Sequence, residues 1–334
     1  KIYIGIVLRN PVKHIKMSFD KNTQEIIQKS LDAYRELKIN HTEGDWSASP
    51  VEEKNFDLRD FLLQKKGVLE KFRRTYLVAG RHNFPDSPRG GFYIEWGTPG
   101  DIPIQLRIHG RFKVFWMVAK LSLYKKFRLN FTKLVDKKIG KPVTQNIFGL
   151  NITESQIRNF YYKEEIKKYL GSDFDAILEV GGGFGGLAGE LLKNFTIKRY
   201  YFVDLFDALP LAYFYLRQIL PNDEIQILTH KDSEIKSSAK VIILPPSLLY
   251  KISNKISLFI NTMSFQHMNL KSINFYLKEA SRLETKNLFL NNRDWIRDPS
   301  DIKISDYPIP KKYKKFLDKK WLYGNHRLQI FKIF

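Results

Sequence analysis

The stretch ILEVGGGFGG, residues 177–186, decides how the rest of the chain is interpreted. Apolar residues flank the acid Glu179, as in a buried strand, and glycine then fills every position from 181 to 186 except Phe184. Glycine loses more conformational freedom on folding than any other residue, so a glycine cluster indicates a tight turn that a ligand approaches closely. We therefore expect a strand over 176–180, a turn, and a helix over 186–194.

The glycine turn predicts a nucleotide-type site without fixing which nucleotide binds. Backbone amides at the start of the following helix carry partial positive charge and suit an anionic or polar cofactor group. Gly181, Gly183 and Gly186 also match the G-x-G-x-x-G spacing of dinucleotide sites. By itself the turn is compatible with a nicotinamide dinucleotide as well as with other nucleotide cofactors.

Two acids favour a cofactor that carries an ammonium group. Glu179 stands two residues before the first glycine, at a position that dehydrogenase loops usually keep apolar. An acid there can hold a cation such as the amino group of a methionine moiety, which NAD lacks. Asp204 ends the strand RYYFVD, near the roughly 20-residue spacing from the first glycine that is typical of a carboxylate binding ribose hydroxyls, and it would serve either cofactor.

From about residue 152, short β-rich runs alternate with helical segments, which is the signature of a parallel sheet built from βαβ units. Besides the elements around the glycine turn, we expect helices over 153–170, 207–219 and 270–282, and strands over 199–204, 225–229, 241–244, 257–261, 286–291 and 327–333. Residues 1–150 predict a mainly helical region, with helices over 20–37, 57–75 and 112–127 and an irregular loop over 81–104. The expected organisation is an N-terminal substrate lid or dimerisation region (1–150) and a cofactor-binding domain (151–334).

Several stretches resemble known enzymes. ILEVGGGFGG followed by YYFVD looks like motif I and the second strand of class I S-adenosylmethionine-dependent methyltransferases. More narrowly, four stretches resemble the sugar O-methyltransferase family of bacterial glycan clusters: ITESQIRNFYYKEEI (152–166), YYFVDLFDALPLAYFYL (200–216), SLFINTMSFQHMN (257–269) and LFLNNR (288–293). The similarity covers roughly residues 150–334. It implies an α/β fold with a Rossmann-like class I methyltransferase sheet, mostly parallel with an antiparallel last strand.

The resemblance also implies the cofactor and its contacts. The cofactor is S-adenosylmethionine, with S-adenosylhomocysteine as the product, and the reaction is transfer of a methyl group to a sugar hydroxyl. The implied contacts are Glu179, Gly181, Gly182, Gly183 and Gly185 at the methionine end and Asp204 at the ribose. Asn261, at the end of the strand over 257–261, is a further candidate for orienting the cofactor or a sugar hydroxyl.

A neutral hydroxyl acceptor must lose its proton, which asks for a general base that works near pH 7, and histidine is the natural candidate. His267 lies in INTMSFQHM, just beyond the carboxyl end of a predicted strand, where ligands gather in open α/β sheets. We expect His267 to be the base, with Gln266 beside it as a catalytic or orienting residue. His326 and Arg293 follow at later strand ends as weaker candidates, and Arg293 could pair with an acidic sugar or phosphate.

Composition limits the class of protein. The chain of 334 residues is 43% hydrophobic, too apolar for disorder, yet it has no apolar run near the ~20 residues of a membrane-spanning helix. It has no cysteine, which excludes disulfides and thiolate metal sites, and its opening KIYIGIVLRNP predicts no secretory signal, so we expect a cytoplasmic protein.

The net charge of +21 favours anionic partners or reflects lysines spread along the surface. The densest basic run, KKYKKFLDKKW over 311–321, fits an amphipathic helix.

Other functions stay open at this point. VIILPPSLLY, residues 241–250, resembles the loop of amino-methyltransferases that act on adenine or cytosine, but Leu244 and Ser247 replace its hydrogen-bonding and stacking residues. The alternatives are nucleic-acid methylation, methylation of another small molecule, and an NAD(P)-dependent oxidoreductase. We expect a sugar or glycan acceptor and no stable nucleic-acid partner; an anionic or lipid-linked acceptor, a peripheral membrane contact and a homodimer are left open. No metal is expected, because the strand ends carry no paired acids beyond Asp204 and Asp207.

Overall fold

The structure is a computed structural model that describes residues 104–333, apart from gaps at 127, 136–138, 141, 143, 206–207, 221–223, 233, 297–301 and 322–325. Side chains are described from residue 112 onwards. The helices predicted over 20–37 and 57–75, and the loop predicted over 81–104 up to its last residue, lie outside the described residues. The helix predicted over 112–127 is α6, which runs from Ile104 to Tyr124.

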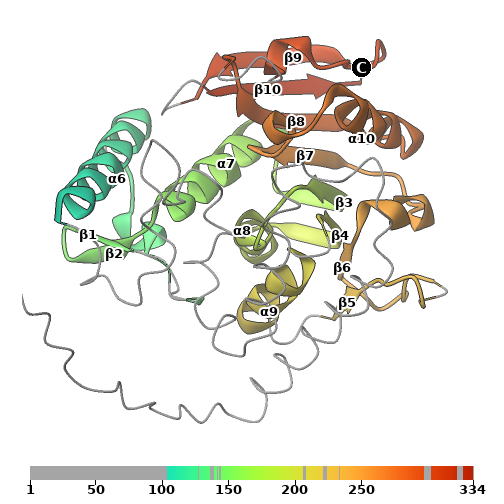
Figure 1. Cartoon of the computed structure of the whole chain (residues 1–334), viewed down its shortest axis with the longest axis horizontal. Coiled ribbons are helices and arrows are strands. Elements are labelled where there is room, and N and C mark those ends of the chain that lie inside the picture. Colours follow the sequence, from blue (N-terminus) through green and yellow to red (C-terminus); the bar gives the residue numbers. More distant parts are fainter. Residues whose placement is uncertain are drawn as a thin grey trace, which may run out of the picture.

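An eight-stranded sheet forms the centre of the described part, in the order β5-β6-β4-β3-β7-β8-β10-β9 (Figure 1). Its strands are β3 (Asp173–Val180), β4 (Thr196–Val203), β5 (Ile225–Ile227), β6 (Val241–Leu244), β7 (Leu258–Thr262), β8 (Asn287–Arg293), β9 (Lys314–Lys320) and β10 (His326–Lys332). Strands β3 to β8 pair in parallel, whereas β10 runs antiparallel to both β8 and β9. This confirms the predicted α/β, Rossmann-like sheet with an antiparallel last strand.

Helices cover both faces of the sheet. One hydrophobic cluster packs α7 (Glu154–Leu170), α8 (Gly186–Asn194) and α9 (Leu209–Ile219) against alternate strand residues. A second cluster packs α10 (Leu270–Arg282) and the short 3-10 helix η5 (Pro246–Lys251) against the opposite face. Strands that are covered on both faces have continuous apolar sequences. VIIL in β6 is an example, because all four of its residues are buried. Among the described residues, no helix has the length and apolarity needed to cross a membrane.

Side-chain caps fix where two of these helices begin. The hydroxyl of Thr153 accepts a hydrogen bond from the Gln156 amide at 3.1 Å and starts α7. The side chain of Asn269 accepts from the Ser272 amide at 2.8 Å and starts α10. Such caps satisfy amides that have no partner inside the helix. Both starts agree with the predicted helices within one residue.

Two elements differ from the sequence prediction. The helix suggested for residues 311–321 is wrong, because Lys314–Lys320 is the edge strand β9, paired only with β10 among the described strands. Lysines are common on edge strands, where they discourage pairing with other chains. The hairpin of β1 (Gln145–Ile147) and β2 (Leu150–Ile152) was not predicted. Its turn residues, Phe148 and Gly149, have φ of 52° and 78°, as a tight hairpin turn requires.

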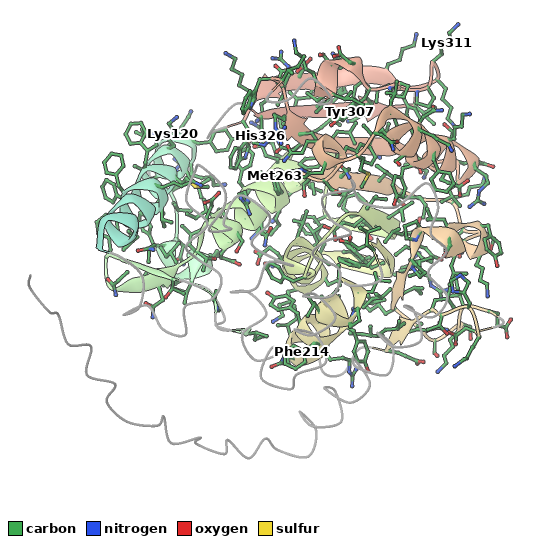
Figure 2. All side chains as sticks on the ribbon, in the orientation of Figure 1. Lys120, Phe214, Met263, Tyr307, Lys311 and His326 are labelled. Carbon is green, nitrogen blue, oxygen red and sulfur yellow. The ribbon has the colours of Figure 1, made fainter. Side chains whose placement is uncertain are left out.

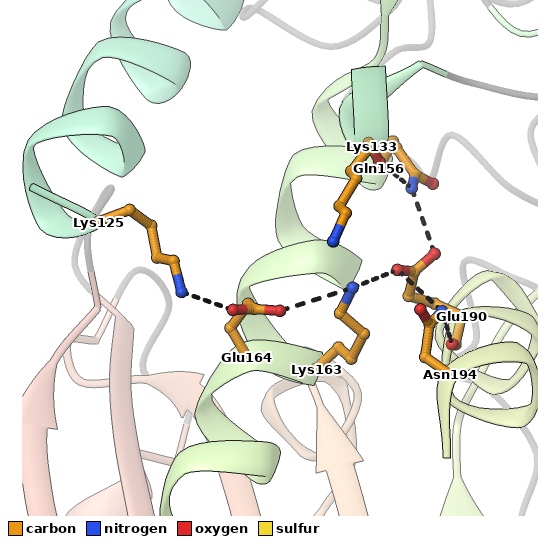
Figure 3. A network of polar contacts seen from close by, with 7 residues as sticks. All are labelled: Lys125, Lys133, Gln156, Lys163, Glu164, Glu190 and Asn194. Atoms are coloured by element: carbon orange, nitrogen blue, oxygen red, sulfur yellow. Dashed lines mark hydrogen bonds and ion pairs between the residues drawn. The ribbon is translucent and has the colours of Figure 1, made fainter. Parts of the chain in front are cut away.

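A partly buried polar network fixes α7 against its neighbours (Figure 3). Lys163 Nζ, on a side chain that is 5% exposed, lies 2.9 Å from Glu190 Oε1 on α8. It also lies 3.6 Å from Glu164 Oε1, and Glu164 Oε2 accepts from Lys125, just after α6, at 2.6 Å. Burying charges is costly unless they are paired, so this arrangement holds α6, α7 and α8 in one relative position.

Candidate functional site

The carboxyl ends of β3 and β7 lie side by side where the chain changes direction across the sheet. After β3, the chain adds β4, β5 and β6 on one side of β3. It then returns to the other side of β3, where it adds β7 and β8. In open α/β sheets, ligands bind outside the carboxyl ends of the strands at such a switch point. The glycine turn follows β3 and residues 263–269 follow β7, so both sequence motifs lie at this edge.

The glycine turn has a backbone that only glycine adopts readily. Gly181, Gly183 and Gly185 have φ of 75°, 61° and 83°. A Cβ on Gly182 would lie 2.3 Å from Cε2 of Phe202, so the core excludes a side chain there. A Cβ on Gly183, in contrast, would meet no atom within 4 Å. A ligand can therefore reach the backbone at Gly183.

Glu179 is buried at the end of β3, with 1% of its surface exposed. Its Oε2 accepts a hydrogen bond from the Tyr200 hydroxyl at 2.7 Å, whereas its Oε1 is buried and has no hydrogen-bond partner. Burial raises the pKa of Glu179 to about 7, with the Tyr200 hydrogen bond lowering it and the Asp204 charge raising it. A buried carboxylate oxygen without a partner is costly, and a cationic ligand group would satisfy it.

Asp204 follows β4 and is held at the glycine turn. Its Oδ2 accepts from the Gly183 amide at 2.7 Å, and its Oδ1 accepts from the Leu205 amide at 2.7 Å. These two bonds fix the carboxylate beside the backbone of the glycine turn. The structure thus brings Glu179, Gly183 and Asp204 together, while the ribose contact of Asp204 stays a prediction.

Asn261 lies beneath the site and joins three segments. Its side chain is 0% exposed; Nδ2 donates to the Val180 carbonyl at 2.9 Å. Its Oδ1 accepts from the Phe265 amide at 3.1 Å and from Asn292 Nδ2 at 2.9 Å. These bonds tie the ends of β3, β7 and β8 into one rigid edge. Contact of Asn261 with a cofactor stays a prediction.

The residues after β7 pack directly on the glycine turn. Met263 has φ of 58°, a conformation that is uncommon for a residue with a long side chain, and its amide donates to the Asn291 carbonyl at 2.7 Å. A Cβ on Gly181 would lie 1.9 Å from Oγ of Ser264, which explains why this position is glycine. Backbone strain of this kind clusters at functional sites.

Gln266, which is 8% exposed, connects two histidines. Its Oε1 accepts from the Arg293 amide at 3.1 Å and lies 3.1 Å from His326 Nε2, while its Nε2 lies 3.1 Å from His267 Nε2. Because a backbone amide only donates, the bond from Arg293 fixes which way the Gln266 amide points. It follows that His326 Nε2 donates to Gln266 and that His267 Nε2 accepts from it.

The two histidines therefore differ in what they can offer a substrate. His267 is exposed at the end of the 3-10 helix η6 (Phe265–His267), with its Nε2 engaged by Gln266. His326, at the start of β10, keeps a buried Nδ1 that has no hydrogen-bond partner; Figure 2 labels it together with Met263. Since Nε2 of a neutral His326 carries the proton, its Nδ1 presents a lone pair.

Charges surround His326. Its pKa is lowered to about 4, first by burial and then by the charges of Arg158 and Arg293, with Glu154 raising it and Lys113 lowering it further. The imidazole is consequently neutral near pH 7. Arg293, the other weaker candidate from the sequence, is 5% exposed and lies with its guanidinium 5.6 Å from the centre of the Trp295 ring.

Sequence reasoning missed Tyr200 and Arg158. Tyr200 lies in the strand RYYFVD, where a hydroxyl in an otherwise apolar run was a usable signal. Arg158 lies one helical turn after Glu154 and bonds to it at 2.8 Å, a spacing that is visible in the sequence. What the sequence did not show is that this turn of α7 faces the ends of β8 and β10.

Two further predictions concern neighbouring segments. In VIILPPSLLY, Leu244 is wholly buried and the Ser247 hydroxyl lies 3.2 Å from His230 Nε2. Neither side chain takes the place of the hydrogen-bonding or stacking residue of an amino-methyltransferase loop. In the part of the chain that the structure describes, no three histidine or acidic side chains come together as a metal ion would need. The prediction of a metal-free site stays a prediction.

The sheet order, the glycine turn and the two acids define a Rossmann-like domain of the kind that binds nucleotide cofactors. Solved structures similar to this chain include magnesium protoporphyrin IX methyltransferase from Synechocystis PCC 6803 with bound SAH, at 11% identity and a TM-score of 0.39, covering 52% of this chain and 81% of that chain. Another is mitomycin 7-O-methyltransferase MmcR, at 12% identity and a TM-score of 0.39, covering 53% and 54%. TrmK from M. capricolum with S-adenosyl-homocysteine is 12% identical, with a TM-score of 0.34, covering 52% and 68%.

These likenesses carry no argument about function at such identities and TM-scores. No family model matches the sequence, and no curated protein matches it.

Proposed function

We propose that the chain is an S-adenosylmethionine-dependent O-methyltransferase that methylates a hydroxyl of a sugar in a bacterial surface glycan or its precursor. The observation that supports this cofactor is the buried Oε1 of Glu179, which has no hydrogen-bond partner. Glu179 lies at the strand end just before the glycine turn, where the backbone of Gly183 is open. The ammonium group at the methionine end of S-adenosylmethionine would give this oxygen a partner. NADH has no such group.

The other residues of the edge fit the same cofactor. Asp204 is held at the glycine turn, at the spacing typical of a carboxylate that binds ribose hydroxyls, and the glycine backbone admits the methionine part. The sugar acceptor is supported by the resemblance of residues 152–166, 200–216, 257–269 and 288–293 to sugar O-methyltransferases. These segments correspond to most of α7, the end of β4 with α9, β7 with the residues after it, and β8, and they include Asp204, Asn261 and Gln266 of the site.

The chain's own residues must align the acceptor, exclude water and take its proton. When bound, S-adenosylmethionine supplies a methyl group on a positively charged sulfur. A histidine of this chain would take the proton of the acceptor hydroxyl as that oxygen receives the methyl group. His267 is the predicted base, and the unpartnered Nδ1 of His326 supports the second candidate from the sequence.

Calorimetric titration with S-adenosylmethionine, S-adenosylhomocysteine and NADH tests the cofactor. We expect the first two to bind and NADH not to bind, and we expect Glu179→Gln to weaken the first two by about ten-fold or more, as loss of one charge-assisted hydrogen bond predicts. Binding of NADH alone would establish the oxidoreductase alternative and overturn the proposal. Methyl transfer to RNA or DNA, but not to sugars, would support the nucleic-acid alternative.

Two matched variants test the base once an acceptor is known. In His267→Asn and His326→Asn, affinity for S-adenosylhomocysteine should stay as in the unchanged protein. Loss of the base lowers kcat by about 10²–10⁴, whereas loss of the other histidine has a smaller effect. Unchanged kcat in both variants would exclude a histidine base.

A further inference from the structure

Charged side chains from three elements gather around His326. Arg158 on α7 donates to Glu154 Oε1 at 2.8 Å, and Lys113 Nζ on α6 lies 2.6 Å from Glu154 Oε2. Arg293 on β8 and His326 on β10 are directly paired in the antiparallel register. The group thus contains three cations and one acid.

Helix α7 places Arg158 over the end of β8. Glu154, Arg158 and Tyr162 succeed one another at one-turn intervals, so they share one face of the helix. The hydroxyl of Tyr162 donates to Asn291 Oδ1 at 2.8 Å, and Asn291 lies two residues before Arg293 on the same face of β8. Arg158 is therefore one turn closer than Tyr162 to the carboxyl edge, where Arg293 ends its strand.

The same turn of α7 also reaches the glycine turn. A Cβ on Gly186 would lie 2.7 Å from Nδ2 of Asn159, the residue next to Arg158. Arg158 therefore precedes, along α7, a residue that packs on the end of the glycine turn, and an acceptor site must lie near the cofactor.

Polar atoms around Arg293 lack partners within the protein. His326 Nδ1, Asn291 Nδ2 and the Tyr307 hydroxyl are all buried and form no hydrogen bond. Tyr307 is 5% exposed, and the charge of Arg293 acts on the pKa of its hydroxyl. Buried polar atoms are hydrogen-bonded in the great majority of cases, so three such atoms around one strand end indicate a polar ligand.

We propose that Arg158 and Arg293 bind an oxyanion of the acceptor, a carboxylate or a phosphate, so that the substrate is an anionic sugar. The inference rests on the proposed function and narrows its acceptor. Arginine suits this role because its planar guanidinium can donate two parallel hydrogen bonds to a carboxylate or phosphate. An anion held there would present a neighbouring hydroxyl to His326 Nδ1 and would offset the positive charges that depress the basicity of this imidazole.

The test measures binding to protein saturated with S-adenosylhomocysteine, at constant ionic strength, with D-glucuronate, inorganic phosphate and D-glucose as probes. We expect glucuronate or phosphate to bind at least about ten-fold more tightly than glucose, and the stronger of the two identifies the oxyanion. Arg158→Gln should remove this preference. The matched control is Arg327→Gln, on the same strand as His326, because Arg327 pairs with Asp318 and Asp294 and, as the next residue along β10, faces the other side of the sheet.

The outcomes separate the two proposals. Absence of S-adenosylhomocysteine binding would overturn the proposed function before any anion is added. Binding of S-adenosylhomocysteine, with neither anion preferred over glucose, would overturn this inference and leave the proposed function standing. An equal loss of anion binding in Arg327→Gln would mean that general surface charge causes the anion preference, and this too would overturn the inference. If Arg158→Gln does not fold, Lys113→Gln, which removes a cation of the same group, should weaken anion binding by several-fold.

A second readout reports on geometry. In histidine-labelled protein, bound anion should raise the pKa of His326 measured by NMR in the unchanged chain and in Arg327→Gln, but not in Arg158→Gln. A purely structural role of Arg158 would leave that response intact.

Discussion

The hydroxyl of Tyr200 donates a 2.7 Å hydrogen bond to Oε2 of Glu179, across the adjacent strands β4 and β3. Both side chains are buried, and burial keeps the pKa of Tyr200 well above its usual value of 10.0, so the hydroxyl stays a donor. One carboxylate oxygen is thus held by the protein, while the other has no partner within it. This relationship makes Glu179 both a cost to stability and a binding group.

Glu179→Gln should stabilise the ligand-free protein above neutral pH. The folded pKa of Glu179, about 7, exceeds its ordinary value of 4.5, so the folded state binds the extra proton between these values. Stability of the unchanged chain therefore falls as pH rises from about 4.5 to 7, by up to about 3 kcal/mol, and is flat above that range. Glutamine does not titrate, so this fall in stability should be absent in Glu179→Gln. Urea denaturation at pH 5 and pH 8 would measure it, and an identical pH dependence in both proteins would contradict it.

Tyr200→Phe should shift the pH at which cofactor binding is half-maximal. The Tyr200 hydrogen bond lowers the pKa of Glu179, so its loss raises that pKa, by about one unit if the bond contributes about 1.5 kcal/mol. Because the ionised carboxylate binds the ammonium group, S-adenosylhomocysteine affinity should then rise at a higher pH. Tyr201→Phe is the matched control, since its hydroxyl bonds Asn254 Oδ1 at 2.7 Å. Equal profiles for the two variants would exclude this role of Tyr200.

Gly183→Ala should abolish binding more than it destabilises the fold. At φ of 61° an alanine costs about 1 kcal/mol, but its Cβ would occupy the open space that the cofactor needs. Gly149→Ala, with φ of 78° and equally open surroundings in the β1–β2 turn, carries the same backbone strain but should leave S-adenosylhomocysteine affinity unchanged. Thermal unfolding and S-adenosylhomocysteine titration of both proteins would show the difference. Normal affinity in Gly183→Ala would place the cofactor elsewhere.

Lys163→Met should destabilise the protein by about 3 kcal/mol, because it leaves the part-buried carboxylate of Glu190 without its cation. Lys198→Met removes an ion pair with Asp175 that is no longer than that of Lys163 with Glu190, but both of these side chains are largely exposed, so little change is expected. Urea denaturation measures both. Similar stabilities would mean that the network of Figure 3 does not hold α7 in place.

Local patterns were enough to predict the centre of the fold. The strand, glycine turn and helix over 173–194 follow from apolar burial and from glycine's access to positive φ, both of which act over neighbouring residues. A local pattern could not predict the strand β9, because Lys314–Lys320 has little apolar character of its own. It becomes a strand by pairing with β10, a contact that the local pattern does not encode.

The sequence by itself therefore determined the Rossmann-like order of elements and the acidic residues beside the glycine turn, since these depend on local spacing. Only the tertiary structure decided that Asn261 holds the strand ends together, that Gln266 links His267 to His326, and that the charges of Arg158 and Arg293 both act on His326. These relationships join residues from α7, β7, β8 and β10 that are far apart in the chain. They exist because parallel strands bring their carboxyl ends to one edge and packing then fixes which side chains face each other there.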